Sequence, residues 1–295
     1  MILPSSEDLF KVNADHGSFF HTSYSHGLLT RLSKEPSKGN LSLRDCIGLS
    51  CDLKASVAAG VNKTIELLHL NVNLSTSFTG LASDVIGPKA VELGWAILEG
   101  DDENLVTFKT SMFSGAGLAG YPSVVSAAKE LFSKRMAGDE NVIPGSLRWE
   151  VFGIVADHGR LEELEALADL WKNSSNEDEQ YLALECLGLA PNGELMKWVL
   201  GHSLSETVKN HEMFYLTWVA GGTAHGAIEL WEWTKENWEG VEKEVPVDIA
   251  SLFLGTALEG LHAQEQIEDV KGFFAIRDTK SYQMVIDHNL EGMRN

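Results

Sequence analysis

The residues best suited to chemistry gather in one short segment, residues 208–218. His211, Glu212, Tyr215 and Trp218 all occur there. On a helix, His211, Tyr215 and Trp218 would share one face because they are spaced i, i+4 and i+7. A histidine among aromatic side chains can serve as a general acid or base, since burial tunes its pKa. The alternative is that this face packs on a neighbouring helix and the histidine is satisfied structurally.

Three further candidates occupy predicted junctions between helices. His225 follows the glycine-containing stretch 221–224, where we expect a loop whose side chains can reach a ligand. Glu259 and His262 lie at another junction, where a carboxylate can orient an imidazole. The alternative for all three is a solvated loop side chain.

Motifs for metals and cofactors are missing from the chain. Asp101, Asp102 and Glu103 resemble an acidic magnesium motif, but capping and the helix dipole also favour acidic residues at helix N-termini. The three cysteines lack the spacing of a zinc site, and no His-Glu-x-x-His pattern occurs. The glycines of residues 115–120 are attributed to close helix packing rather than to a phosphate-binding loop. We therefore expect neither a metal nor a cofactor.

The acidic composition narrows the classes of partner. The 295 residues include 43 acidic and 23 basic side chains, for a formal net charge of −20. A field of this sign disfavours nucleic acids and anionic membranes, and it attracts cationic ligands or basic partners. Residues 1–8 lack the features of a signal peptide, and no apolar run reaches the roughly 18 residues of a membrane span. With an odd number of cysteines, these features predict a cytoplasmic protein.

The elements that must position the candidate residues are predicted to be helices. Residues 1–25 form an extended N-terminal segment or a short hairpin that turns at residues 15–17. Ser42 is predicted to cap a helix that ends within residues 55–60. Amphipathic spacing then predicts helices over residues 62–70, 101–115, 121–137, 147–158, 161–171, 177–187, 193–200, 206–219, 228–238, 248–258, 263–274 and 279–293. Residues 80–88 are predicted to be an irregular insert.

These helices recur in pairs every few tens of residues, which is typical of helical-hairpin arrays. We predict an all-α fold, an α-solenoid of antiparallel helical hairpins of the HEAT and armadillo type, curled into a bowl. A single domain is expected over residues 1–295, with the helical repeats at residues 26–295. Trp231, Trp233 and Trp238 are assigned to its core.

Several stretches match one protein family, in the family's order and along nearly the whole chain. They include residues 10–17, 22–24, 93–95, 115–120, 137–139, 147–152, 230–238, 265–266, 273–274 and 290–291. The chain resembles the C-terminal helical domain of zinc aminopeptidases of the puromycin-sensitive and endoplasmic-reticulum types, in particular their fungal cytosolic branch. In the full enzymes this domain is a bowl of short helices that covers the catalytic domain and holds the far end of the substrate. The family's zinc motif is absent here, so the resemblance does not imply peptidase activity.

Departures from the family pattern direct attention to further residues. Phe20 and His21 stand where the resemblance implies Tyr-Arg, and Cys46 also replaces an arginine. His211 and Glu212 replace Gln-Asp. Because an unpaired buried charge is costly, we expect the acidic partners of the lost arginines to have vanished with them. A less ionic interior would follow, although drift after loss of a catalytic domain explains the same changes.

Two functions from different classes follow from this reading. The first is a metal-independent isomerase or cyclase that binds a small, mostly apolar molecule in the concave cavity. Its catalytic residues would be His211 and Glu212, and its ligand-binding residues would be Phe20, His21, Tyr215, Trp218, His225, Glu259 and His262. The second is a non-catalytic binding or adaptor module for a peptide, a partner protein or an aminopeptidase catalytic domain. A fragment of a larger aminopeptidase is a further possibility.

Overall fold

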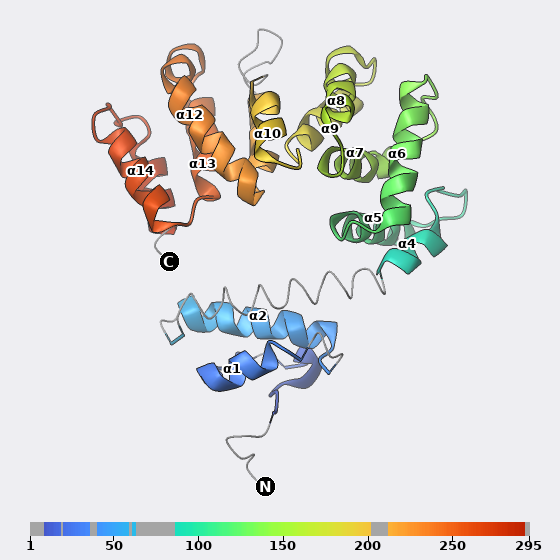
Figure 1. Ribbon diagram of the computed structural model, residues 1–295, viewed down its shortest axis with the longest axis horizontal. Helices are drawn as coiled ribbons and strands as arrows, with labels where there is room; N and C mark the ends of the chain where they lie inside the picture. Colours follow the sequence, from blue (N-terminus) through green and yellow to red (C-terminus); the bar gives the residue numbers. More distant parts are fainter. Residues whose placement is uncertain are drawn as a thin grey trace. The chain divides into compact units, whose positions relative to one another are not determined.

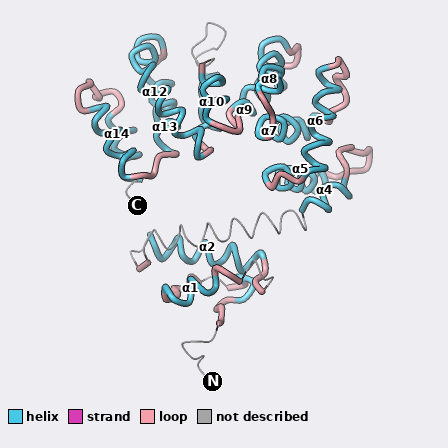
Figure 2. Tube along the Cα trace, viewed as in Figure 1, coloured by secondary structure: helices cyan, strands magenta, loops and turns pink. Residues whose placement is uncertain are grey.

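The computed structural model describes residues 9–18, 20–35, 40–58, 61–62, 86–201 and 212–292. Within these ranges the chain is helical or irregular and forms no strand (Figure 2). This result confirms the predicted all-α class. It also favours an extended lead-in over a hairpin for the described part of residues 1–25.

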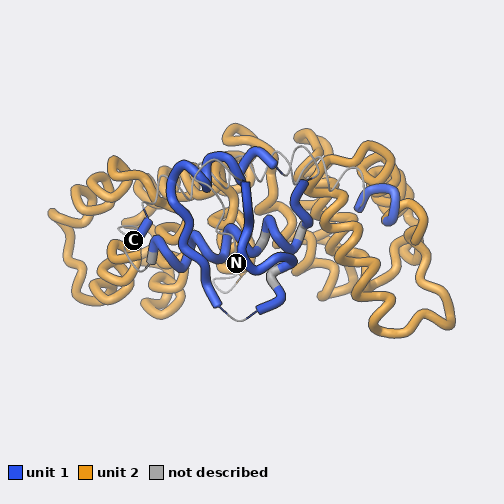
Figure 3. The backbone as a smooth tube through the Cα atoms, turned by 90° about the horizontal axis from the view of Figure 1, so that it is seen from below, with its two compact units in different colours: residues 1–89 blue, residues 90–295 orange. Residues whose placement is uncertain are grey.

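The chain forms two compact units, residues 1–89 and residues 90–295 (Figure 3). The boundary falls within a short helix, α4 (Gly87–Leu93), so the last two residues of the predicted insert at 80–88 are helical. Residues 80–85 and most of the predicted helix at 62–70 lie outside the described residues. The single domain expected from the sequence stays a prediction.

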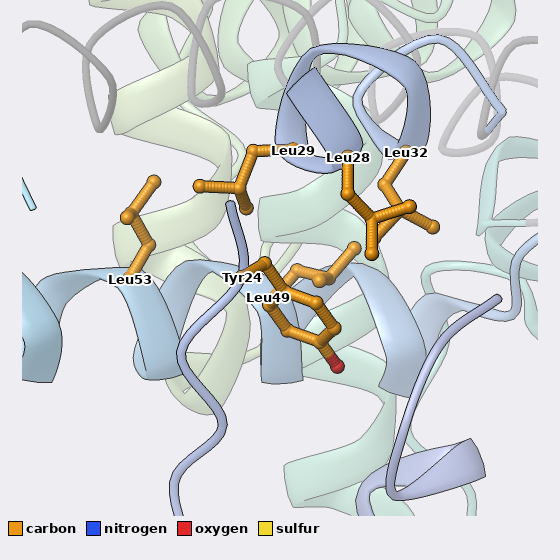
Figure 4. Packing of buried hydrophobic residues seen from close by; sticks show 6 residues of the cluster. All are labelled: Tyr24, Leu28, Leu29, Leu32, Leu49 and Leu53. Carbon is orange, nitrogen blue, oxygen red and sulfur yellow. The ribbon is translucent and has the colours of Figure 1, made fainter. Parts of the chain in front are cut away.

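The first unit is built on two helices, α1 (His26–Leu32) and α2 (Leu43–Ala58). Their apolar faces, together with Tyr24 just before α1, form one buried cluster, which Figure 4 shows: Tyr24, Leu28, Leu29, Leu32, Leu49 and Leu53. The Tyr24 hydroxyl both accepts from the backbone N–H of Val12, at 3.2 Å, and donates to the Val12 carbonyl, at 3.1 Å. The tyrosine thereby holds the N-terminal segment against the core.

Polar contacts attach the same N-terminal segment to the start of α2. The Lys11 ammonium lies 2.8 Å from Asp45 Oδ1, and the backbone N–H of Asp15 donates to the same oxygen at 2.8 Å. Asp15 belongs to a 3-10 turn, η1 (Ala14–His16), at the position of the predicted turn. Ser42 Oγ accepts from the backbone N–H of Asp45 at 3.1 Å, which confirms Ser42 as the cap of α2.

Eleven helices are described in the second unit beyond α4, and their colours follow the chain order in Figure 1. They are α5 (Glu103–Leu118), α6 (Pro122–Met136), α7 (Arg148–Asp157), α8 (Leu161–Asn173), α9 (Glu177–Leu187), α10 (Gly193–Leu200), α11 (Glu212–Gly221), α12 (Ala224–Glu244), α13 (Val247–Glu259), α14 (Gln264–Phe274) and α15 (Gln283–Gly292). The predicted bounds of α9 and α10 are correct at both ends. Asn176 and Asn192 cap these two helices by accepting backbone N–H groups, so their start points are encoded locally.

Alternate helices of the second unit stack in chain order. Contacts join α5 to α7, α7 to α9, α9 to α11, α11 to α13, and α13 to α15. The intervening helices α6, α8 and α12 pack on this row, through α7, α9 and α13 respectively. This is the packing expected of an array of helical hairpins, whereas the curvature into a bowl stays a prediction.

Glycine permits the closest of these helix contacts. A Cβ on Gly188, at the end of α9, would lie 2.7 Å from the Leu216 carbonyl oxygen of α11. A Cβ on Gly117 of α5 would overlap the Ile154 side chain of α7. The second contact confirms the helix-packing interpretation of the stretch 115–120 at Gly117.

Candidate functional site

The predicted chemical face of residues 208–218 is described from Glu212 onward, and His211 lies outside the described residues. Glu212 begins α11 and is buried, with 7% of its surface exposed. Tyr215 is half-buried and contacts the ring of Tyr181 on α9, with centroids 5.4 Å apart. Trp218 is 56% exposed and stacks on Phe214 at 5.7 Å. Beyond Glu212, the described part of this face therefore consists of aromatic rings in contact with other aromatic rings.

His225 has a structural hydrogen bond. It lies in the first turn of α12 rather than in the expected loop, because Thr223 caps the helix ahead of it by accepting from the Gly226 N–H. The His225 Nε2 lies 2.6 Å from the carbonyl oxygen of Ala190, which can only accept, so Nε2 carries the proton. The half-buried ring thus ties α12 to the segment after α9.

Glu259 and His262 are both exposed, as the alternative reading of these residues expected. Glu259 ends α13, and His262 lies in the turn before α14, where its backbone N–H donates to Gln266 Oε1 at 2.9 Å. No hydrogen bond or ion pair between the two side chains is found in the part of the chain that the structure describes. They do not form the expected orienting pair there.

Phe20 and His21 belong to the first unit. Phe20 is 50% exposed. His21 Nδ1 lies 3.1 Å from Oδ1 of Asp52, a carboxylate of α2 that is fully buried. The expectation that acidic partners vanished with the arginines is therefore wrong at this position. His21 has a buried acidic partner and is held at the surface of its unit.

Two carboxylates of the second unit, Glu185 and Glu150, stand in no motif that marks them in the sequence. Glu185 lies one turn after Tyr181 on α9 and near the Trp149 side chain of α7, which acts to lower its pKa against the larger effect of burial. Glu150, the next residue of α7, is only 8% exposed. The Ser114 hydroxyl donates to its Oε1 at 3.4 Å, and its Oε2 has no hydrogen-bond partner among the described residues. Burial raises the pKa of both carboxyls above the ordinary value.

The acidic run at residues 101–103 has a structural role. The Asp102 side chain accepts from the Leu105 backbone N–H at 2.8 Å, which confirms the capping interpretation. Asp101 Oδ2 lies 2.6 Å from the Lys109 ammonium. No cluster of three or more His, Cys, Asp or Glu residues that could hold a metal ion is found within the described ranges.

Two of the tryptophans assigned to the core and one cysteine are buried in the second unit. Trp231 and Trp238 are each 2% exposed, which confirms them as core residues, and the Trp231 indole donates to Asp269 at 2.7 Å. Cys186 is buried, and desolvation raises the pKa of its thiol well above the ordinary value. A thiol in that state is a poor nucleophile.

Across the described residues, no helix is both long and apolar enough to cross a membrane.

Comparison with known proteins confirms the family resemblance. The profile of the ERAP1-like C-terminal domain matches residues 71–295. Aminopeptidase 2 of Candida albicans is 29% identical over 98% of this chain and 35% of its own length. The alanine/arginine aminopeptidase of Saccharomyces cerevisiae is 29% identical over 98% of this chain and 37% of its own length. Aminopeptidase M1-A of Oryza sativa is 21% identical over 96% of this chain and 36% of its own length. The chain thus spans about a third of the length of these relatives.

Proposed function

Because the chain belongs to the family of ERAP1-like C-terminal domains, we propose that it acts as a non-catalytic module that binds peptides. Its relatives are named aminopeptidases, which process peptides, and the chain spans about a third of their length without a His-Glu-x-x-His motif. A peptide-binding module working with an aminopeptidase catalytic part is the simplest role for such a domain. The cytoplasmic location expected from the sequence remains a prediction.

The observation that carries this proposal is the aromatic surface of α9 and α11, formed by Tyr181, Phe214, Tyr215 and Trp218. Tyr181, Phe214 and Tyr215 are half-buried, while Trp218 leaves more than half of its surface in water although it stacks on Phe214. Aromatic side chains offer a large apolar area with few rotatable bonds, so ordering them on binding costs little entropy. Adjacent rings on neighbouring helices are therefore well suited to hold the side chains of a bound peptide.

The isomerase or cyclase hypothesis receives less support from the same residues. Glu212 is buried at the start of α11, His225 is bound to a backbone carbonyl, and Glu259 and His262 are exposed and separate. General acid–base catalysis needs its groups within hydrogen-bond reach of one substrate atom. His211 lies outside the described residues, so the catalytic pair His211 and Glu212 stays a prediction.

The proposal is tested by measuring the binding of labelled peptides to the full chain by fluorescence anisotropy. Trp218→Ala is expected to weaken peptide binding by about thirtyfold, the effect of removing a binding residue worth about 2 kcal/mol. Met284→Ala serves as the matched control, because Met284 is 83% exposed on α15 and is likewise a large apolar side chain. Its removal is expected to leave the affinity unchanged.

Two outcomes would overturn the proposal. The first is the absence of peptide binding by the wild-type chain. The second is a small apolar molecule that copurifies with the chain, is retained in native mass spectrometry, and is released by Glu212→Ala but not by Trp218→Ala. That result would support the isomerase or cyclase hypothesis instead.

A further inference from the structure

The net negative charge of the chain is confined to its second unit. Residues 1–89 contain eight acidic and eight basic side chains, so this unit is formally neutral. Residues 90–295 contain 35 acidic and 15 basic side chains, so they carry the whole formal charge of −20. Solubility of the chain alone gives no reason for such a division. A field of this strength draws cations to the second unit and repels anions from it.

One carboxylate of this unit lies among aromatic rings from three alternate helices, α7, α9 and α11, of which α9 contacts the other two. Glu185 and Tyr181 are one turn apart on α9 and so lie on the same face. The Trp149 side chain of α7 lies near Glu185, and Tyr215 of α11 contacts the Tyr181 ring at 5.4 Å. We call these four residues the Glu185 site. All four retain some exposure, and Trp149 is 38% exposed.

A second carboxylate near this site has an oxygen that accepts no hydrogen bond from the described residues. Glu150 follows Trp149 on α7, is more than nine-tenths buried, and has one oxygen without a hydrogen-bond partner among the described residues. Glu150 and Glu185 both act electrostatically on the buried thiol of Cys186, so both lie close to that residue. No described ion pair includes either carboxylate. Two acids without a cation among the described ion pairs, beside partly exposed rings, are chemically suited to a positive group supplied from outside.

We propose that the Glu185 site binds the cationic side chain of an arginine or lysine residue in a peptide. This inference rests on the proposed peptide-binding function and adds its specificity. A guanidinium can stack on the Trp149 or Tyr181 ring while it donates charge-assisted hydrogen bonds to the Glu185 carboxylate. An arginine side chain meets both requirements at once because its donors lie in the plane that stacks.

The bound cation also predicts a dependence on pH. Burial raises the pKa of Glu185 and of Glu150, so the neutral carboxyl forms persist to higher pH than in an exposed residue. A cation favours the ionised form. Selectivity for the basic peptide is therefore expected to weaken as the pH falls through the raised pKa values and the carboxylates become protonated.

The test uses two short peptides that differ at one position, where one has arginine and the other has its neutral analogue citrulline. Their affinities for the full chain are compared by fluorescence anisotropy at physiological salt. The wild-type chain is expected to bind the arginine peptide about ten- to a hundredfold more tightly, as for a hydrogen bond to a charged group. Glu185→Gln is expected to reduce this ratio to near one and to leave the citrulline affinity unchanged.

A matched control separates the site from the general field of the unit. Glu236→Gln removes the same charge from an exposed position on α12, and it is expected to retain the preference for arginine. Trp149→Leu supplies a second variant of the site, whose expected effect is a partial loss of the preference. Circular dichroism checks that each variant is folded.

The outcomes distinguish the two proposals. If wild-type chain binds both peptides equally, the cation site is wrong while the peptide-binding function stands. If Glu185→Gln and Glu236→Gln reduce the arginine preference equally, the preference comes from the overall field and the site is again wrong. If neither peptide binds, the proposed function itself fails.

Discussion

The ion pair between Arg135 of α6 and Glu179 of α9 offers a sharp test of how the second unit is held together. Arg135 donates from Nε to Glu179 Oε1 at 2.9 Å and from its Nη2 to Oε2 at 2.6 Å. The Ser174 hydroxyl also donates to Oε2, at 2.6 Å. The Glu179 side chain is 2% exposed and that of Arg135 is 13% exposed. The pair is therefore a bidentate contact between two largely buried charges.

Replacement of Arg135 by alanine would leave the Glu179 carboxylate buried with only the Ser174 hydroxyl as a side-chain donor. Removal of one partner from a buried ion pair lowers the free energy of unfolding by about 3–5 kcal/mol. We expect about 3 kcal/mol, because the Ser174 hydrogen bond remains. The double replacement Arg135→Met with Glu179→Leu is expected to recover most of the loss, since no buried charge is then left unpaired.

The same pair predicts how the free energy of unfolding changes with pH. Burial alone would raise the pKa of Glu179. Hydrogen bonds from Arg135 and Ser174, with the charges of Arg135 and Arg148, together outweigh burial, so the pKa lies below the ordinary value. A carboxyl with a lowered folded pKa contributes stability above its unfolded pKa of about 4.3 and loses it as the pH falls through the folded value. The difference in unfolding free energy between wild type and Arg135→Ala is therefore expected to be full at neutral pH. It is expected to shrink as the pH falls, because the Glu179 carboxyl without Arg135 takes up a proton at higher pH than the wild-type carboxyl does.

The assay is urea denaturation followed by far-ultraviolet circular dichroism, with the unfolding free energy obtained by linear extrapolation at several pH values. Lys134→Ala is the matched control. Lys134 is the adjacent residue and pairs with Glu130 at 2.7 Å, but both side chains are more than half exposed, so its removal is expected to change little. Equal losses for Arg135→Ala and Lys134→Ala, or a loss for Arg135→Ala that does not vary with pH, would refute the reasoning.

Two further predictions concern stability. Gly188→Ala is expected to lower the unfolding free energy by about 1–3 kcal/mol, because its Cβ would meet the backbone of α11. Gly272→Ala on α14 has no described atom within 4 Å of its Cβ, so it is expected to raise the unfolding free energy by up to about 1 kcal/mol. Urea denaturation checks both, and a similar loss for each would contradict the packing argument. His21→Arg is expected to slow, and His21→Ala to speed, proteolysis of residues 1–89 at neutral pH, because arginine always carries the charge that buried Asp52 requires. The opposite order would show that the contact of residue 21 with Asp52 does not stabilise the first unit.

Much of the fold could be predicted because helix signals are local. The ends of α9 and α10 follow from apolar spacing and from asparagine caps that lie beside the helices they begin. Ser42 and Asp102 likewise cap helices whose residues follow them directly. Helix α12 is longer than predicted at both ends, because Thr223 caps it early and the charged residues of its last turns showed no apolar periodicity.

The candidate site could be predicted only in part. The spacing of Tyr215 and Trp218 on one helix face is a local property, and both lie in the aromatic surface of α9 and α11. Nothing local connects Trp149 to Glu185, which are 36 positions apart, or separates a histidine bound to a carbonyl, such as His225, from a free one. Such pairings depend on which helices stack, and a single sequence does not encode that order in any short pattern.

The amino-acid sequence by itself determined the helical class, the family, the excess of negative charge and the starts of several helices, because each depends on composition or on neighbours within a turn or two. Tertiary structure alone decided which acids are buried, which rings remain exposed and that His21 keeps an acidic partner in Asp52. Burial and pairing arise from side chains far apart in the chain. The free energy of a charge changes with what surrounds it in space, so the chemical character of Glu150 and Glu185 emerges only when the helices are packed.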